Sequence, residues 1–173
     1  PLPECTSETA TEKSYRLIKE IYAAEGSTEQ SVPILYDKKT KRIVNNESAE
    51  IIRMLDRHAN ALTANMREQA YLYPEDDTLR NEIDILNKII YTSINNGAYK
   101  AGFSSDQQIY AKAFYDYFQT LSELEKKLAV DDRPFLTGAN FTEADLRLFP
   151  TLYRHDPIYY LRMKLNGAKI LDY

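Results

Sequence analysis

Glu47 and Ser48 stand where a short run of β-forming residues gives way to a helical pattern. The first N–H groups of a helix have no partners within it, and the positive end of the helix dipole lies there, so a helix start attracts a carboxylate. The Ser48 hydroxyl could add a hydrogen bond, and the Glu47 carboxylate could pair with an ammonium group. The junction could therefore bind a zwitterion, although a helix cap at Ser48 and a first-turn acid at Glu47 explain the same residues.

Cysteine and histidine chemistry has little support in this sequence. The single cysteine, Cys5, excludes an internal disulfide framework, and the two histidines, His58 and His155, are too far apart for any familiar zinc spacing. Cys5 lies beside Glu4, whose negative charge disfavours a thiolate. We therefore expect no metal site and no reactive thiolate at Cys5.

The composition is that of a globular protein of 173 residues, 43% of them hydrophobic and 28% charged. Its formal net charge of −4 argues against a nucleic acid or an anionic membrane as partner, because both require a basic surface. The sequence contains neither a signal-peptide pattern nor the roughly 18 consecutive apolar residues of a membrane span. We expect an intracellular protein, in the cytoplasm or in an organelle.

The elements that would position the Glu47–Ser48 pair read as α-β-β-α over residues 9–62. A capping box at 9–12 and a glycine at Gly26 delimit a first helix, and residues 32–36 and 42–44 form a hairpin with Pro33 opening its first strand. Helical spacing of apolar residues then covers 49–62.

After residue 78 the sequence is helical throughout. Long apolar stripes at 79–94 and 110–128 predict two helices, and breaks are expected at 97–105 and 131–140. A Thr-x-x-Asp capping box, Thr142 to Asp145, starts a further helix. The predicted fold class is thus α/β plus all-α, with a small unit at 1–74 followed by a helical unit at 75–173.

Four segments of the sequence resemble those of a known protein family: "SVPILYDKKTKRIVNNESAEIIRML", "INNGAYKAGF", "LTGANFTEADLRLF" and "RHDPIYYLRMKLN". In combination they resemble the glutathione transferases, and among these the glutathionyl-hydroquinone reductases of the xi class. The resemblance covers roughly residues 28–173. It implies that 1–74 is the C-terminal part of a thioredoxin-like, glutathione-binding domain with a linker, and that 75–173 is a truncated transferase-type helical domain.

The same resemblance implies a glutathione site in the first unit. Glu47 and Ser48 would bind the γ-glutamyl end of glutathione, and Val32 would present its backbone N–H and C=O to the cysteinyl part, next to a cis bond to Pro33. Just upstream, where such proteins tend to have a basic residue, this chain has Glu29.

In the helical unit the resemblance implies roles for two of the 14 tyrosines. Tyr99 matches a proton donor or acceptor for the quinol oxygen, and Tyr159 matches a tyrosine that faces the catalytic sulfur. A phenol offers both an O–H donor and an aromatic face for a quinone ring. His155 occupies a position that is aromatic in the family, which we interpret as a local substitution.

The nucleophile of xi-class enzymes is a cysteine in a Cys-Pro-aromatic context, and this sequence has Thr after Cys5. We therefore expect the nucleophilic cysteine to lie outside this chain, both ends to be truncated, and the chain alone to be inactive. The complete protein would reduce glutathionyl-hydroquinones with glutathione as cosubstrate, as a homodimer.

Two other hypotheses remain from the sequence. In the first, the chain is a non-catalytic, transferase-like binding or assembly subunit of a larger complex. In the second, it is a helical interaction domain with an accidental resemblance. A Cys-Pro-aromatic motif encoded upstream of Pro1 would distinguish the enzyme from the non-catalytic subunit.

Overall fold

The computed structural model describes residues 15–62, 71–130 and 132–173, and the chain divides into two compact units, Pro1–Glu68 and Gln69–Tyr173. The predicted capping box at 9–12 and Cys5 lie outside the described residues. None of the helices in the described ranges is long and apolar enough to cross a membrane.

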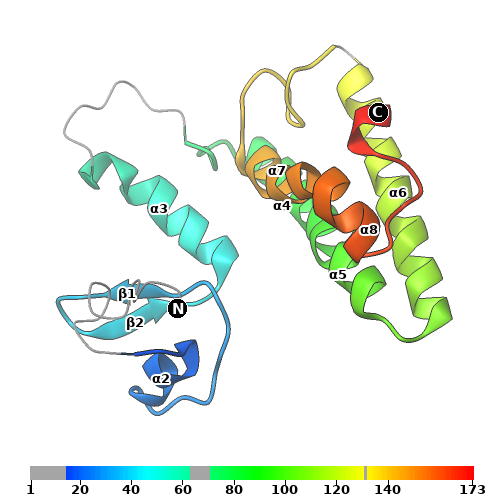
Figure 1. The fold of residues 1–173 in the computed structure, drawn as a ribbon. Helices are drawn as coiled ribbons and strands as arrows, with labels where there is room; N and C mark the ends of the chain where they lie inside the picture. The colour runs from blue at the N-terminus through cyan, green and yellow to red at the C-terminus, as the bar shows by residue number, and fades with distance from the viewer. Residues whose placement is uncertain (1–14, 63–70, 131) are drawn as a thin grey trace. The chain divides into compact units, whose positions relative to one another are not determined.

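The first unit contains helix α2 (Ile18–Ala23), strands β1 (Leu35–Asp37) and β2 (Arg42–Asn45), and helix α3 (Ser48–Leu62) (Figure 1). This is the α-β-β-α order that the sequence predicts. Gly26 follows the end of α2 with φ at 77°, a conformation that glycine adopts without steric cost.

The strands are antiparallel, with Tyr36 opposite Ile43. Asp37 closes their turn, because contacts of its carboxylate with Thr40 Oγ1 (2.6 Å) and Lys39 N (2.8 Å) hold the turn and lower the pKa of that carboxyl.

The first strand is shorter than predicted. We expected it to span 32–36, but it begins at Leu35, and the bond between Val32 and Pro33 is cis. Pro33 has no N–H to donate to a ladder, so regular pairing starts only after it. Residues 31–34 are therefore a loop leading into the strand.

The second unit is helical, and its longest connection lies between α6 and α7 (Figure 1). In chain order it contains α4 (Asp77–Ile89), the π-helical η1 (Ile90–Asn95), α5 (Asn96–Phe103), α6 (Gln107–Ala129), α7 (Glu143–Arg154), the π-helical η2 (His155–Tyr159), α8 (Tyr160–Arg162) and the 3-10 turn η3 (Ile170–Asp172). No strand occurs among the described residues of this unit, apart from an isolated bridge between Phe135 and Gly138.

One continuous core holds these helices together. Ile90, Ile94, Ala98 and Ala101 are fully buried along η1 and α5, and Tyr117 meets them from α6. Burying a side chain of isoleucine size contributes about 1.5–3 kcal/mol. The remaining buried members come from α4, α6, the loop before α7, α7, η2 and the C-terminal segment: Leu86, Ala113, Leu121, Leu124, Leu136, Ala144, Leu148, Tyr159, Met163 and Leu165.

The helix break that we predicted at 97–105 is wrong for most of its length. Helix α5 includes Gly97 and continues to Phe103, and only residues 104–106 connect it to α6. A glycine inside a helix costs about 1 kcal/mol relative to alanine, but the burial of Ala98 and Ala101 in the core favours a continuous helix. Asp106 then starts α6 by accepting from Gln108 N (2.7 Å) and Ile109 N (3.0 Å).

In the capping box at the start of α7, the Asp145 carboxylate accepts the hydrogen bonds. Asp145 Oδ2 accepts from Thr142 N at 2.9 Å, as predicted, and the Thr142 hydroxyl donates to the same oxygen at 3.1 Å. Asp145 Oδ1 also accepts from Leu136 N at 2.9 Å. The carboxylate thereby fixes both the start of α7 and the loop that precedes it, where the sequence predicts a break.

Candidate functional site

The loop before β1 exposes the first group of candidate residues. The Val32–Pro33 bond is cis, which confirms what the resemblance implies, and the Val32 side chain is 72% exposed. In this loop the backbone of Val32 takes no part in the β1–β2 ladder, which starts at Leu35. An extended ligand could therefore pair with it by main-chain hydrogen bonds, as an added strand does.

Ser31 connects this loop to the start of α3. Its hydroxyl accepts from Asn46 Nδ2 at 3.1 Å and donates to Glu29 Oε2 at 3.2 Å, while its carbonyl accepts from the buried Tyr22 hydroxyl at 3.0 Å. Asn46 directly precedes Glu47, so one hydrogen bond joins the Val32–Pro33 loop to the junction with Ser48. Sequence reasoning missed Ser31, Asn46 and Tyr22, because these contacts span 9 to 15 residues of the chain.

Glu47 and Ser48 are both exposed at the start of α3. The carboxylate that caps the helix belongs to Glu47, whose Oε1 accepts from Ala49 N at 3.2 Å. The Ser48 hydroxyl lies 3.5 Å from the same oxygen, at the limit of a hydrogen bond. A ligand carboxylate at this helix start would compete with Glu47 for the backbone N–H groups, whereas an ammonium group would meet a carboxylate already in place.

The second unit brings Tyr99 and Tyr159 together. Their hydroxyl oxygens lie 3.1 Å apart, and their rings meet edge to face with centroids 5.9 Å apart. Tyr99 is 44% exposed and Tyr159 only 4%. Phe103, one helical turn after Tyr99, stacks on its ring at a centroid distance of 6.0 Å and is itself exposed. The resemblance named these two tyrosines separately, and the contact between their phenols is a finding of the structure.

The buried phenol of this pair, Tyr159, is hard to deprotonate. Burial and the hydrogen bond with Tyr99 raise the pKa of Tyr159 to about 12, against the opposing effect of Arg154 nearby. Tyr159 therefore stays protonated at neutral pH and can donate to the Tyr99 oxygen. Tyr99 then keeps its own O–H free for a ligand, and a phenol that accepts a hydrogen bond becomes a better donor.

Irregular helical segments position both tyrosines. Tyr99 lies on α5, directly after the π-helical η1, and Tyr159 is the last residue of the π-helical η2. π-helical turns occur frequently at functional sites. Gly102 lets α5 approach the end of α8, the helix that follows η2, because a Cβ at this position would overlap the Met163 side chain.

His155 has more contacts than a local substitution predicts. Its ring is completely buried and stacks on Tyr117, with centroids 5.5 Å apart at an interplanar angle of 18°. Its Nδ1 lies 2.9 Å from the Tyr117 hydroxyl and its Nε2 lies 2.9 Å from the Ala168 carbonyl oxygen. The predicted aromatic character of the position is retained, and two hydrogen bonds are added that no spacing in the sequence indicates.

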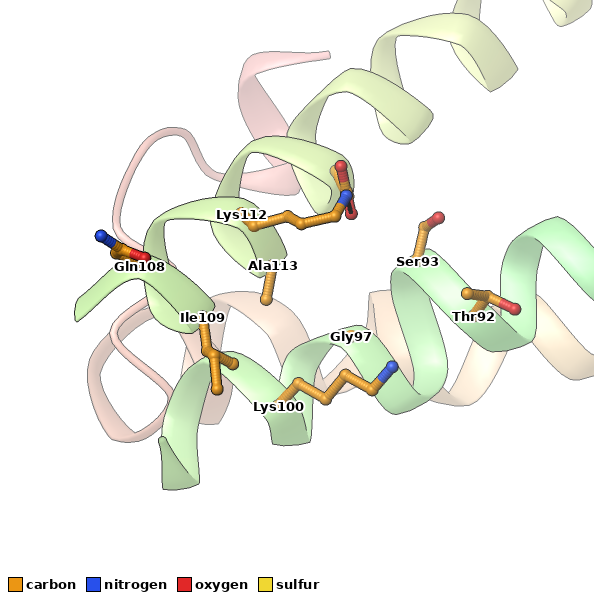
Figure 2. Close-up of a pocket in the computed structure, with 9 residues that line it drawn as sticks. Thr92, Ser93, Gly97, Lys100, Gln108, Ile109, Lys112 and Ala113 are labelled. Atoms are coloured by element: carbon orange, nitrogen blue, oxygen red, sulfur yellow. Dashed lines mark hydrogen bonds and ion pairs between the residues drawn. The ribbon is translucent and has the colours of Figure 1, made fainter. Parts of the chain in front are cut away.

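An open pocket of about 530 Å³ lies between η1, α5 and the first turns of α6 (Figure 2). Gly97 and Ala113 are buried at its base, and Lys112 is paired with Asp116 at 2.7 Å on its α6 side. The other lining residues are Thr92, Ser93, Lys100, Gln108 and Ile109. Within the described residues, no group of three or more histidine, cysteine, aspartate or glutamate side chains could hold a metal ion.

The predicted site residues thus form two groups, one in each unit: Val32, Pro33, Glu47 and Ser48 in the first, and Tyr99 and Tyr159 in the second. Each group is held together by contacts within its own unit. The first offers an exposed backbone segment, a carboxylate and the start of a helix, and the second offers an exposed hydroxyl beside exposed aromatic rings.

Comparison with known proteins gives the same family from sequence and from structure. Residues 107–170 match the family described as "Glutathione S-transferase, C-terminal domain". The glutathionyl-hydroquinone reductase PcpF of Sphingobium chlorophenolicum is 46% identical over 143 residues, which are 83% of this chain and 44% of PcpF. The chain thus spans less than half the length of this relative.

Solved structures agree with this comparison. The glutathione-bound structure of YqjG, a glutathione transferase homologue from Escherichia coli K-12, superposes with a TM-score of 0.86 at 39% identity, covering 99% of this chain and 54% of that one. Glutathione transferase Xi 1 from Trametes versicolor gives a TM-score of 0.83 at 42% identity, covering 92% and 55% of the two chains. By sequence and by fold, this chain is therefore similar to the xi-class glutathione transferases, of which it spans about half the length.

Proposed function

We propose that the full-length protein reduces glutathionyl-hydroquinones to hydroquinones, with glutathione as cosubstrate. The contact between the phenols of Tyr99 and Tyr159, at 3.1 Å, is the observation that carries this proposal. It supplies an exposed O–H beside an exposed aromatic face, as a quinol ring with a reacting oxygen requires. The reductase PcpF, which carries this activity in its name, supports the same proposal by its 46% identity.

Glutathione binding is proposed for the first unit. Glu47 would pair with the ammonium group of the γ-glutamyl end, and Ser48 and the N–H groups at the start of α3 would bind its carboxylate. The backbone of Val32 would pair with the cysteinyl residue beside the cis bond to Pro33. The bond from Asn46 to Ser31 supports this arrangement, because it holds the loop against the helix start.

The reaction requires a cysteine thiolate, which we propose lies outside these 173 residues. The thiolate would form a bond to the glutathionyl sulfur while the carbon–sulfur bond breaks. The electron pair of that bond stays on the ring carbon, which takes up a proton to give the hydroquinone. A second glutathione thiolate then attacks the mixed disulfide, releases glutathione disulfide and regenerates the enzyme thiolate.

Tyr99 would exchange a proton with the quinol oxygen during this reaction. Tyr159, which keeps its own proton because its pKa is raised to about 12, would orient the Tyr99 phenol and face the sulfur. No metal is part of the proposed chemistry. We further propose that the protein works as a homodimer in a reducing compartment, the cytoplasm or an organelle, where glutathione is available.

An assay of the full-length protein tests the proposal. Glutathionyl-menadiol and glutathione should give menadiol and glutathione disulfide, each identified by mass spectrometry, in equal amounts. The 173-residue chain alone, assayed in parallel, should give no turnover. A full-length protein that binds glutathione by calorimetry but releases no menadiol would reject the enzyme and favour a non-catalytic binding or assembly subunit.

A further inference from the structure

A chain of buried hydrogen bonds connects α6 to the segment that carries Tyr159. Tyr117 on α6 and His155 at the start of η2 are both completely buried, with the Tyr117 hydroxyl 2.9 Å from Nδ1 of the histidine. The other ring nitrogen, Nε2, lies 2.9 Å from the Ala168 carbonyl oxygen in the C-terminal segment. Three parts of the unit, separated by 13 to 38 residues of sequence, therefore meet at one imidazole.

The chemistry of these groups fixes the direction of both bonds. A carbonyl oxygen can only accept, so Nε2 of His155 carries the hydrogen and donates it to Ala168. In the neutral ring Nδ1 is then an acceptor, and the Tyr117 hydroxyl donates to it. Burial raises the pKa of Tyr117 above its ordinary value, so this phenol keeps the proton that it donates. The imidazole has one tautomer and one orientation.

The same histidine begins the π-helical turn that ends at Tyr159. The His155 carbonyl accepts from Tyr160 N, the bond that closes this turn. The Tyr159 carbonyl in turn accepts from Met163 N at 3.0 Å. The ring of Tyr160 packs edge-on against the imidazole at a centroid distance of 6.4 Å. Rotation or displacement of the imidazole would therefore displace the backbone that carries the Tyr159 phenol.

We propose that His155 is a positioning residue, which holds η2 so that the Tyr159 phenol stays against Tyr99. Its kinetic consequence rests on the proposed function, but its effect on the phenol pair does not. Of these two residues only Tyr159 contacts Tyr99 directly, and His155 acts through the backbone of η2 and through Tyr117. A residue with only a packing role would stabilise the unit without affecting the phenol pair.

Two substitutions remove the hydrogen bonds while keeping the ring packing: Tyr117→Phe and His155→Phe. Tyrosines labelled with ¹³C at Cζ are titrated by NMR, with Tyr159→Phe used to assign the signal. In the wild type the Tyr159 phenol should titrate near pH 12, and in both variants its midpoint should move toward the ordinary value of 10. Circular dichroism checks that each variant is folded at the temperature of the titration.

Tyr110→Phe is the matched control. The Tyr110 hydroxyl also lies on α6 and donates to a backbone carbonyl of the C-terminal segment, Lys164 O at 2.9 Å, without contacting His155. This variant should lose thermal stability and leave the Tyr159 midpoint near 12. A folded Tyr117→Phe or His155→Phe protein whose Tyr159 midpoint stays at the wild-type value would overturn the proposal.

Kinetics of the full-length protein provide a separate readout. Tyr117→Phe should lower kcat for glutathionyl-menadiol by about 10-fold, the effect of losing one well-placed hydrogen bond, with KM changed less than about 2-fold. If the wild type shows no turnover at all, the proposed function fails while the titration still decides the role of His155. Normal kcat in a variant with a shifted midpoint would reject the catalytic importance of this positioning.

Discussion

The two units hold their candidate residues by different means. In the first unit, Glu47, Ser48 and Val32 are exposed and lie on turns or at a helix start, linked through single hydrogen bonds such as Asn46 to Ser31. In the second, Tyr159 is itself part of the hydrophobic core, and Tyr99 rests on it. The first site therefore depends on a few polar contacts, and the second on the packing of the whole helical unit.

This difference has a consequence for mutations. A change among the exposed groups of the first unit should affect ligand affinity and leave stability nearly unchanged, since exposed hydrogen bonds contribute little net stability. A change in the core of the second should affect stability first, and through it the phenol pair. Substitutions in each unit, and a change of pH, test that contrast.

Truncation of the core should have the largest effect. Ile90 is completely buried, and Ile90→Ala should lower the free energy of unfolding by about 2–5 kcal/mol, because it removes buried methyl groups and leaves a cavity. Urea denaturation followed by circular dichroism measures the loss. The control, Ile109→Ala, removes the same atoms from a side chain that is 55% exposed, and should cost less than about 1 kcal/mol. Equal losses in the two variants would contradict a site supported by the core.

Removal of a ligand contact in the first unit should reduce affinity instead. Glu47→Gln and Ser48→Ala in the full-length protein should each weaken glutathione binding by about 1–3 kcal/mol, because each leaves a charge of the ligand less well paired. Calorimetry measures the affinity, and thermal unfolding should be almost unchanged. Glu125→Gln, in the exposed part of α6, serves as the control for loss of charge. If both site variants bind like the wild type, the glutathione site is elsewhere.

Loss of the exposed phenol should affect turnover more than binding. Tyr99→Phe in the full-length protein should lower kcat by about 10-fold and raise KM much less, because the proton is needed most in the transition state. Steady-state kinetics with glutathionyl-menadiol give both constants. Tyr115→Phe, which removes a hydroxyl that is also exposed, is the control and should behave like the wild type. Unchanged turnover in Tyr99→Phe would remove this residue from the mechanism.

Alkaline pH should also affect the second unit. Because the folded-state pKa of Tyr159 is raised to about 12, the native state keeps a proton that the unfolded state loses from pH 10 upward. The stabilisation from this group is therefore fully present below pH 10 and is lost as the pH rises toward 12. Urea midpoints between pH 9 and about 11.5 should fall more steeply in the wild type than in Tyr159→Phe. Parallel curves would show that the phenol is not shifted.

Local patterns in the sequence predicted much of the fold. The helix start at Ser48, the glycine after α2 and the Asp145 carboxylate that caps α7 each depend on residues within a few positions of one another. The first strand was predicted to begin three residues too early, because a proline near its start was taken as part of the ladder. The continuation of α5 through Gly97 was missed, because a glycine inside a helix is tolerated only where core packing supports it.

The candidate site was less accessible from sequence. Tyr99 and Tyr159 are in contact although 60 residues separate them in the sequence, and Tyr117 and His155 are separated by 38. The periodicity of the sequence gives no information about contacts at such separations. The resemblance named the first two tyrosines, but not their contact with each other. It also identified the cis bond at Pro33, which spacing alone does not indicate.

The π-helical turn at 90–95 has a consequence for insertions and deletions. Such a turn holds one residue more than an α-helical turn closed by the same number of bonds. Because the extra residue is taken up within the turn itself, deleting one residue there would close a regular α-helical turn and leave everything that follows in nearly the same phase around the axis. Tyr99 would then still face Tyr159. A deletion in a regular part of the helix would instead rotate the residues that follow by about 100°. The turn at 90–95 is therefore the place where this helix can lose a residue without separating the phenol pair.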